Sequence, residues 1–233
     1  MHAFDRTERL IGRAALEALN QSRIAVIGIG GVGSFAAEAL VRSGIGAITL
    51  VDSDCIDETN INRQIHAMQN TVGEPKVDVM RKRLLSVNPT CRIEALQMRY
   101  TPQAEGMIDL KQFDYVLDCI DSVSDKEALI VDCIRTQVPV ISCMGAGNRM
   151  DPTAFRVMDI YDTSVDPLAR VMRSRLRKRG VKALKVVCSL ETPRETSTSG
   201  VHRRVAASIV FATSVAGMVM ASEAVLDIAL RGK

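Results

Sequence analysis

Residues 23–43 read RIAVIGIGGVGSFAAEALVRS, in which a short apolar run, a glycine-rich turn and a segment of helical character follow one another directly. Similar apolar runs, short and partly β-branched, lie at 24–29, 48–51, 115–120 and 138–143. The stretches of helical character between them are 34–43, 76–87 and 126–136. Strands that alternate with helices in this way predict right-handed crossovers. We therefore expect an α/β fold, a doubly wound and mostly parallel sheet with helices on both faces.

The composition is that of a folded protein with free thiols. With 233 residues and 47% hydrophobic content, the chain can bury a substantial core, and we expect a single domain over 1–233. The net charge of +3 is too small to indicate a partner. The six cysteines lie far apart and no pair forms Cys-x-x-Cys, so we expect no structural zinc and a reducing, cytoplasmic setting.

The glycine turn and the acid after the next strand predict adenosine binding. A turn between a strand and a helix presents free amides at the helix start to phosphate oxygens. Asp52 ends the second apolar run, where a carboxylate accepts hydrogen bonds from ribose hydroxyls, and Asp54 follows it. The glycines expected to contact the nucleotide are Gly28, Gly30, Gly31 and Gly33. A turn that merely packs is the alternative without function, and nicotinamide or flavin binding is the rival with one.

Polar residues behind this turn favour a triphosphate over a redox cofactor. Asn60, Arg63 and Gln64 fall in the loop after the second strand, and Lys76 follows that loop. Fixed donors at this edge suit a leaving pyrophosphate, where negative charge develops. Taken singly, each residue also fits a structural role, as a loop-turn residue or a solvated lysine in the first turn of a helix.

The end of the third apolar run carries two acids, Asp118 and Asp121. A carboxylate near phosphates is a ligand that Mg²⁺ uses together with substrate oxygens, so Asp121 is the predicted metal ligand. The alternative is that Asp121 or Ser122 caps the helix that follows.

These motifs together resemble the adenylating domain of the ubiquitin-activating superfamily, which includes the ThiF and MoeB proteins. The resemblance implies that Asp52 binds ribose and that Asn60, Arg63 and Lys76 hold the phosphates of ATP. It also implies that Asp121 coordinates Mg²⁺, and that catalysis rests on these phosphate and metal residues. The nucleotide-binding core would then occupy about 20–145 and a substrate-side segment about 146–233.

The same resemblance implies a contribution across a subunit interface. In that superfamily an arginine near the N-terminus reaches into the partner subunit's ATP site, and Arg9 is similar to it. Arg6 and Arg13 lie close by in the sequence, and solvation is the alternative role for any of the three.

Two later motifs narrow the resemblance. The stretch from Gly145 to Thr153 and the acid-rich stretch that ends in Asp166-Pro167-Leu168-Ala-Arg170 are similar to the tRNA threonylcarbamoyladenosine dehydratase family. That family has a homodimeric Rossmann-like fold and cyclises the threonylcarbamoyl group of a tRNA adenosine with ATP. The implied partner is tRNA carrying threonylcarbamoyladenosine, with a sulfur-relay protein as a further possible partner. The resemblance extends from about Arg6 through Glu191.

A basic stretch independently indicates an RNA partner. Between 170 and 185 the chain has no acidic residue and eight basic ones: Arg170, Arg173, Arg175, Arg177, Lys178, Arg179, Lys182 and Lys185. Such a concentration of positive charge suits a phosphate backbone. With 3% aromatic residues, recognition would rest on phosphate contacts more than on base stacking. The alternative is a solvated amphipathic helix.

Two further features carry expectations of their own. Cys188 sits in an apolar run and is expected to be a buried structural thiol, while Cys55 is the other candidate for reactivity, disfavoured by the acids beside it. The uncharged stretch 205–222 is rich in small residues, so we expect it to pack inside the protein or across a dimer and expect no membrane contact.

Three other function classes stay open at this level. An activator of a sulfur-carrier or ubiquitin-like protein would share every ATP residue and differ in its partner. A nucleotide-binding module without turnover would bind ATP and leave it intact. An NAD-dependent dehydrogenase ranks last, because hydride transfer has no use for the phosphate-binding donors.

Overall fold

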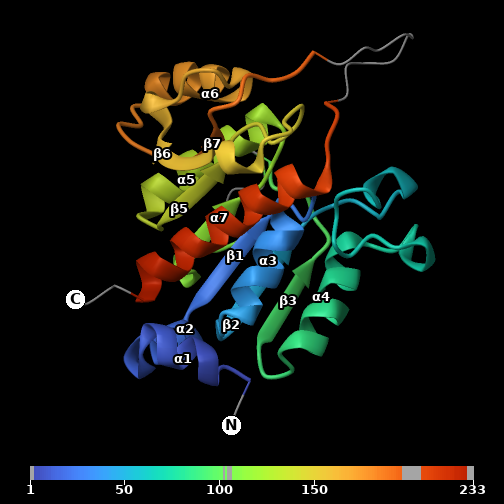
Figure 1. The fold of residues 1–233 in the computed structure, drawn as a ribbon. Coiled ribbons are helices and arrows are strands. Elements are labelled where there is room, and N and C mark those ends of the chain that lie inside the picture. The colour runs from blue at the N-terminus through green and yellow to red at the C-terminus, as the bar shows by residue number, and fades with distance from the viewer. Residues whose placement is uncertain (1–2, 102, 104–106, 196–205, 230–233) are drawn as a thin grey trace.

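The computed structural model describes residues 3–101, 103, 107–195 and 206–229, which form one seven-stranded sheet flanked by helices (Figure 1). The strand order is β3-β2-β1-β4-β5-β7-β6. The strands are β1 (Arg23–Ile27), β2 (Ala47–Val51), β3 (Arg92–Leu96), β4 (Tyr115–Asp118), β5 (Val140–Cys143), β6 (Phe155–Asp159) and β7 (Lys185–Ser189). Every neighbouring pair is parallel except β6 and β7, which are antiparallel. The predicted α/β, mostly parallel sheet is confirmed.

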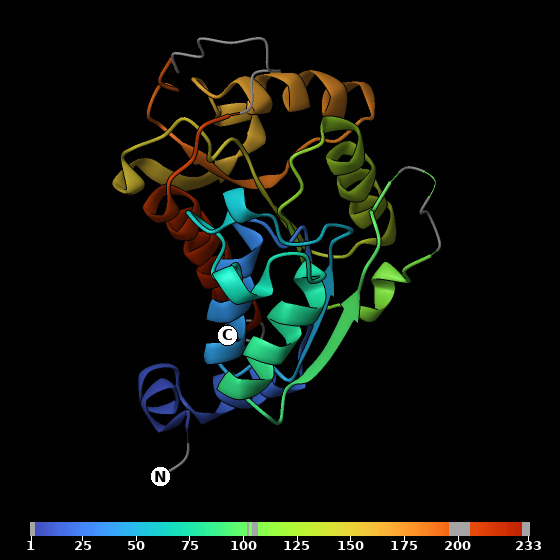
Figure 2. The ribbon, with the colours of Figure 1, turned by 90° about the vertical axis from the view of Figure 1, so that its right-hand side faces the viewer.

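Helices cover both faces of this sheet, as predicted. They are α1 (Asp5–Ile11), α2 (Arg13–Gln21), α3 (Gly33–Arg42), α4 (Lys76–Val87), α5 (Val123–Thr136), α6 (Pro167–Lys178) and α7 (Val210–Ala229). One core joins α2, α3, α4 and α7 to one face of the strands, and the other face packs on α5 and α6. Figure 2 shows the sheet between these two layers.

The four apolar runs of the sequence are β1, β2, β4 and β5, but β1 and β4 end two residues earlier than predicted. Gly28 explains the first difference, because its φ of 93° turns the chain out of the strand. None of the predicted apolar runs corresponds to β3 or β6, which form the two edges of the sheet. The residues of β3 are only partly buried or exposed, so that strand lacks a continuous apolar run.

The order in which successive strands are added to the sheet reverses between β1 and β4. From β1, the crossovers lead to β2 and β3 on one side, and from β4 they lead to β5 and β7 on the other. Ligands of doubly wound sheets bind in the crevice outside the carboxyl ends of the strands at such a point. The fold therefore places a binding crevice beyond Ile27 and Asp118.

The uncharged stretch 205–222 comprises residues 206–209, which precede α7, and the part of α7 up to residue 222; residue 205 lies outside the described residues. By length and hydropathy α7 could cross a membrane, yet 44% of its most apolar window is buried within the protein. Its small residues pack on α3: a Cβ added to Gly217 would lie 2.3 Å from the Val32 carbonyl oxygen. The predicted internal packing is confirmed for the small residues of α7 in this stretch, such as Ala212, Ala216 and Gly217.

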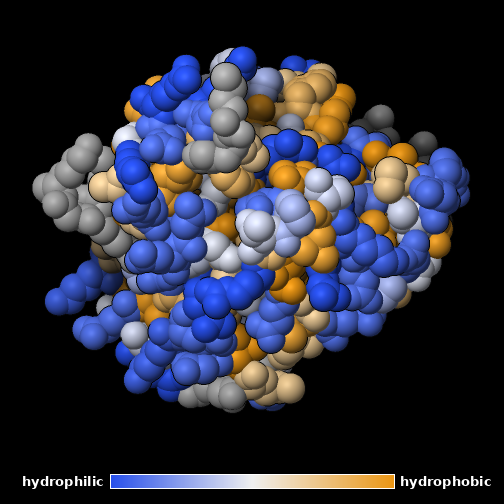
Figure 3. Space-filling model, turned by 90° about the horizontal axis from the view of Figure 1, so that it is seen from below, coloured by the Kyte–Doolittle hydropathy of each residue, from blue (hydrophilic) through white to orange (hydrophobic). Residues whose placement is uncertain are grey.

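The lower end of the molecule is formed by the amino ends of the strands together with α1 and α2 (Figure 1). Hydrophilic residues cover most of the surface seen from this side, with apolar patches between them (Figure 3). No residue of α1 is buried, and Leu10 is 85% exposed. The first helix is thus attached to the body by little of its own surface.

Candidate active site

A cavity of about 770 Å³ opens at the carboxyl ends of the strands, at the reversal point. It brings together nearly all of the residues predicted to bind nucleotide. Those that line it are Gly28, Gly30, Gly31, Asp52, Asp54, Asn60, Arg63, Gln64, Lys76 and Asp121. Two predicted site residues, Gly33 and Arg9, are not part of its lining.

The glycine turn is shaped by close backbone contacts. A Cβ on Gly28 would lie 2.7 Å from the Cys119 carbonyl oxygen, and one on Gly33 would lie 1.8 Å from the Gly28 carbonyl oxygen. Gly33 therefore acts by packing, as it allows α3 to start directly against the turn. No side chain caps α3, whose start faces the cavity through Gly30 and Gly31. A helix start of this kind is a site for phosphate.

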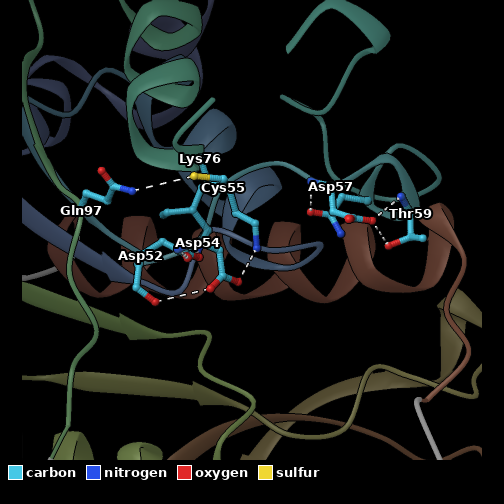
Figure 4. Close-up of polar contacts among 10 residues, drawn as sticks. Asp52, Asp54, Cys55, Asp57, Thr59, Lys76 and Gln97 are labelled. Carbon is cyan, nitrogen blue, oxygen red and sulfur yellow. Dashed lines mark hydrogen bonds and ion pairs between the residues drawn. The ribbon is translucent and has the colours of Figure 1, made fainter. Parts of the chain in front are cut away.

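The acidic pair fixes the rim beyond β2. One carboxylate oxygen of Asp52 accepts a 2.6 Å hydrogen bond from the Ile29 amide, and the other accepts a 2.9 Å bond from the Asp54 amide (Figure 4). Burial raises the pKa of Asp52, against the opposing effect of the Lys76 charge. Asp52 thus holds the glycine turn in place and still lines the cavity, where ribose hydroxyls are its expected ligands.

Lys76 is a buried cation that is held by one partner. Its side chain is 7% exposed, and its Nζ lies 2.8 Å from the Asp54 carboxylate (Figure 4). The Lys76 amide also donates to the Asp54 carbonyl oxygen at 3.0 Å, so the start of α4 is tied to the rim of β2. Asp54 is largely exposed, so its carboxylate can turn to solvent when a nucleotide binds. The Lys76 ammonium group would then pair with phosphate oxygens and would still have an anionic partner.

Asn60 and Arg63 support the loop that they belong to. The Asn60 side-chain oxygen accepts a 3.2 Å bond from the Asp57 amide and closes a capping box around the short 3₁₀ helix Glu58–Asn60. Arg63 Nη1 donates at 2.9 Å to the Thr59 carbonyl oxygen. Both therefore combine the structural and the cavity-lining roles that the sequence presented as alternatives.

Asp121 lines the cavity with an exposed carboxylate, whereas Asp118 does not line it. Asp118 is fully buried and pairs with Lys126 at 2.8 Å. Ser122 occupies the N-cap position of α5 but makes no capping hydrogen bond, so neither Asp121 nor Ser122 acts as a side-chain cap. The described residues contain no cluster of three metal-binding side chains. A divalent cation at Asp121 would accordingly need oxygen ligands from the nucleotide.

The other half of the cavity is made by the segment after β5. Its lining includes Gly145, Gly147, Arg149, Asp166 and Ser208. Residues from 146 onward were expected on the substrate side, and Arg149 and Asp166 lie within the two motifs that carry the family resemblance. Neither residue was assigned a role of its own, because their significance depends on the buried pair that they form.

The remaining candidates lie away from the cavity. Arg9 is exposed on α1, at the end of the sheet opposite the crevice (Figure 1). Cys188 is buried in β7, and burial raises its pKa to about 12, so the thiol is predominantly protonated at neutral pH. Cys55 is exposed, and its sulfur lies 3.9 Å from Gln97 Nε2 (Figure 4).

Comparison with known proteins agrees with this geometry. The ThiF family model matches residues 4–229. The chain is 44% identical to tRNA threonylcarbamoyladenosine dehydratase of Bacillus subtilis over 241 residues, which cover 98% of this chain and 95% of that one. It is 36% identical over 145 residues to the molybdopterin-synthase adenylyltransferase of Escherichia coli, covering 61% of this chain and 57% of that one.

Solved structures show the same fold. The E. coli tRNA N6-threonylcarbamoyladenosine dehydratase in complex with AMP superposes with a TM-score of 0.89 at 38% identity, covering 96% of this chain and 92% of that one. The structure of that protein in complex with ATP gives 0.88 at the same identity, covering 99% and 96%.

One buried residue beneath the site predicts a pH dependence of stability. His66 is fully buried without a hydrogen-bond partner for its ring among the described residues, and burial, then the Lys76 and Arg83 charges, lower its pKa to about 4. Between pH 6.5 and 4 the unfolded chain binds more protons at this residue. The free energy of unfolding should therefore fall as the pH is lowered through that window, by roughly 3 kcal/mol from this residue.

Urea denaturation at several pH values measures this dependence. His66→Leu should flatten the change between pH 6.5 and 4 relative to the unsubstituted protein. An identical pH dependence in both proteins would contradict the assignment to His66.

Proposed function

The chain belongs to the ThiF family, and from this premise we propose that it cyclises threonylcarbamoyladenosine in tRNA with ATP, as a tRNA threonylcarbamoyladenosine dehydratase. One observation carries the proposal: the 44% identity to a dehydratase extends over 98% of this chain and 95% of that relative. Both the nucleotide half and the substrate half of the cavity thus lie within the likeness. The single domain would comprise a nucleotide core at about 20–145 and a substrate side at about 146–233.

The proposed chemistry is activation of a carboxylate followed by ring closure. The threonyl carboxylate attacks the α-phosphorus of ATP, and pyrophosphate leaves as the acyl-adenylate forms. An oxygen or nitrogen of the neighbouring carbamoyl group then attacks the activated carbonyl carbon, a carbamoyl N–H gives up its proton, and AMP leaves. The net change is loss of one water from the nucleoside and cleavage of ATP to AMP and pyrophosphate.

The cavity residues have distinct roles in the first step. Lys76 and Arg63 would stabilise the negative charge that develops on the departing phosphates, because both line the cavity beside the glycine turn. Asp52 would hold the ribose, and Asn60 would keep the loop in register. Ring closure is intramolecular, so the protein need only orient the reacting groups and exclude water.

Magnesium fits the same half of the cavity. Asp121 offers an exposed carboxylate at the end of β4, and magnesium ions commonly combine one or two such groups with phosphate oxygens. When bound, the ion would neutralise phosphate charge and polarise the P–O bonds.

An activator of a sulfur-carrier protein is the second candidate. The likeness to molybdopterin-synthase adenylyltransferase favours it, although that likeness covers only 61% of this chain. The two functions differ in the acyl substrate. Pyrophosphate exchange that requires a carrier protein's C-terminal glycine would support the second function, whereas exchange that requires the modified tRNA would support the first.

The first prediction concerns the two phosphate-side cations. With MgATP and tRNA bearing threonylcarbamoyladenosine, the protein should release AMP and pyrophosphate, and mass spectrometry of the nucleoside should show the loss of one water. Lys76→Ala and Arg63→Ala should each lower kcat by roughly 100- to 1,000-fold, as expected when a donor to developing charge is removed.

Lys82→Ala is the matched control, since Lys82 is an exposed lysine on the same helix. It should leave turnover unchanged. Full activity of both Lys76→Ala and Arg63→Ala would remove these residues from the mechanism.

The basic stretch 170–185 divides into anchored and open side chains. Arg175 and Arg179 both pair with Glu127, a buried carboxylate on α5. Arg173 donates to the Thr163 carbonyl oxygen, and Lys185 pairs with Asp227. These residues contribute to the packing of α6 and β7. Fewer basic side chains are therefore available to RNA than the sequence suggested.

The open face of α6 leads away from the cavity. A shallow hollow along the helix is lined by Arg170, Ser174 and Lys178, by the anchored Arg173, and by Arg177, whose guanidinium lies 4.9 Å from the centre of the Tyr161 ring. The helix begins at Pro167 and Leu168, which line the main cavity. Arg170 to Arg177 spans about 10 Å along the helix axis, a distance over which an RNA strand presents more than one phosphate. We assign this face to the tRNA backbone near the modified adenosine.

The second prediction tests this face. Arg170→Glu combined with Arg177→Glu should raise the KM for tRNA roughly tenfold or more and reduce the salt dependence of tRNA affinity, because phosphate contacts are lost. The affinity for ATP should not change. Arg81→Glu with Arg92→Glu makes the same charge change at a distant surface hollow beside β3 and should have little effect. Equal effects of the two double variants would contradict a local RNA contact.

A homodimer would explain two of the exposed apolar features among the described residues. The outer face of α7 presents Val210, Phe211, Met218 and Leu226, each between 38% and 47% exposed. The unburied helix α1 carries Leu10 and Arg9 at the end of the sheet opposite the crevice. A second copy covering these surfaces would place Arg9 within reach of a site other than its own, where its charge could act on the partner's phosphates. The free thiols suit the cytoplasm as the location.

The third prediction follows from such sharing. Arg9→Ala and Lys76→Ala should each lower the activity by roughly 100-fold or more when pure. Co-expressed chains should recover about a quarter of the unsubstituted activity, because random pairing gives half heterodimers, each with one complete site. Co-expression of Lys76→Ala with Arg63→Ala is the control, because one and the same subunit supplies both residues to a given site. It should recover activity only if Arg63 also acts in trans. Inactive pure variants without recovery in the first mixture would show that Arg9 does not act across the subunit interface, and full activity of pure Arg9→Ala would place Arg9 outside the site.

A further inference from the structure

The substrate half of the cavity contains a buried ion pair that the mechanism above does not use. Arg149 and Asp166 line the cavity, and their side chains are 1% and 0% exposed. Arg149 Nη2 donates to an Asp166 carboxylate oxygen at 2.8 Å. The other Asp166 oxygen accepts a 2.7 Å bond from the Ala169 amide and so caps α6. The carboxylate is thereby fixed by the helix, and the guanidinium is fixed by the carboxylate.

The loop that carries Arg149 is held on its other side as well. Asn148 has a left-handed backbone, with φ of 58°. Its amide donates to the Ala207 carbonyl oxygen at 2.7 Å, and its side-chain oxygen accepts a bond of the same length from the Ala207 amide. A Cβ on Gly145 would lie 2.6 Å from an Asp166 carboxylate oxygen. Glycine at this position is what allows the pair to approach the cavity wall.

Arg149 nevertheless keeps hydrogen-bonding capacity that no described residue uses. Its Nε and Nη1 atoms are buried and have no hydrogen-bond partner. A buried donor left without an acceptor costs about 1–3 kcal/mol. Arg149 is fixed in position and has unused N–H donors, so it forms a preorganised binding site for an acceptor oxygen of a ligand in the cavity. A hydrogen bond made there is shielded from water and is correspondingly stronger.

The charge of the pair selects the kind of oxygen. Asp166 already neutralises Arg149, so a phosphate or free carboxylate would bring an uncompensated negative charge beside a buried acid. A neutral carbonyl oxygen carries no such penalty. The phosphate-side cations lie in the other half of the cavity, where the carboxylate is to be activated.

We propose that Arg149, positioned by Asp166, binds the carbamoyl oxygen of the threonylcarbamoyl group and holds that group for ring closure. The proposal rests on the function proposed above and adds a substrate-binding residue to it. Because both donor atoms are closed to solvent in this conformation, binding requires a small movement of the surrounding loop wall.

Binding of N-carbamoyl-L-threonine in the presence of AMP tests the proposal. Arg149→Lys keeps a cation beside Asp166 and removes the two open donors. It should lower the affinity for the probe at least tenfold, with AMP affinity within twofold and an unchanged thermal unfolding midpoint. Equal affinity in both proteins, or no binding of the probe by the unsubstituted protein, would overturn the inference.

A measurement on the unsubstituted protein guards against misfolding of the variant. In ¹⁵N-labelled protein the Arg149 Nε–H signal should shift when the probe is added to the AMP complex, and an unmoved signal would overturn the inference. Absence of turnover with modified tRNA would instead reject the proposed function, and these binding measurements would still decide the role of Arg149.

Discussion

The close backbone approach between the first strand-turn-helix unit and the end of β4 is the constraint on which the site depends. A Cβ on Gly28 would overlap the Cys119 carbonyl oxygen, and a Cβ on Gly33 would overlap Gly28 itself. Only glycine permits these contacts, which bring the start of α3 to the reversal point of the sheet. The Asp52 carboxylate then accepts the Ile29 amide and fixes the turn from the other side. One set of contacts thus forms the fold and the phosphate site together.

A buried ion pair holds the neighbouring strands in register beneath that site. Lys126 Nζ lies 2.8 Å from Asp118 at the end of β4 and donates to the Cys143 carbonyl oxygen at the end of β5. Ser142 donates to the same carboxylate, so every group in the cluster has a partner. A fully partnered pair of this kind adds little net stability over an apolar core, but loss of one member is costly. Here the ion pair fixes the relative positions of β4, β5 and α5, and therefore the position of Asp121.

The sequence predicted features whose residues are contiguous in the chain. It could not predict which residues far apart in the chain pair with one another. The turn after β1 is recognisable because strand, glycines and helix are contiguous, and the residues from Asp52 to Lys76 follow within the next crossover. The edge strands β3 and β6 gave no comparable signal, because partial exposure leaves them without a continuous apolar run. Arg149 and Asp166 belong to two separate motifs, and the sequence does not show that the fold buries them as a pair. Likewise, Arg170 and Arg175 look equivalent in the sequence, and only the position of Glu127 separates an open side chain from an anchored one.

The distribution of charge divides the cavity according to the two steps of the reaction. On the nucleotide side, Lys76 has a largely exposed carboxylate as its partner, which phosphate oxygens can replace. On the substrate side, Arg149 has a fully buried carboxylate, which nothing in the cavity can displace without leaving a charge unpaired. The first arrangement suits a group whose negative charge grows, and the second suits a neutral group that must be oriented. Formation of the adenylate needs positive charge near the phosphates, whereas ring closure needs a neutral group to be oriented. The two halves of the crevice therefore serve the two steps separately.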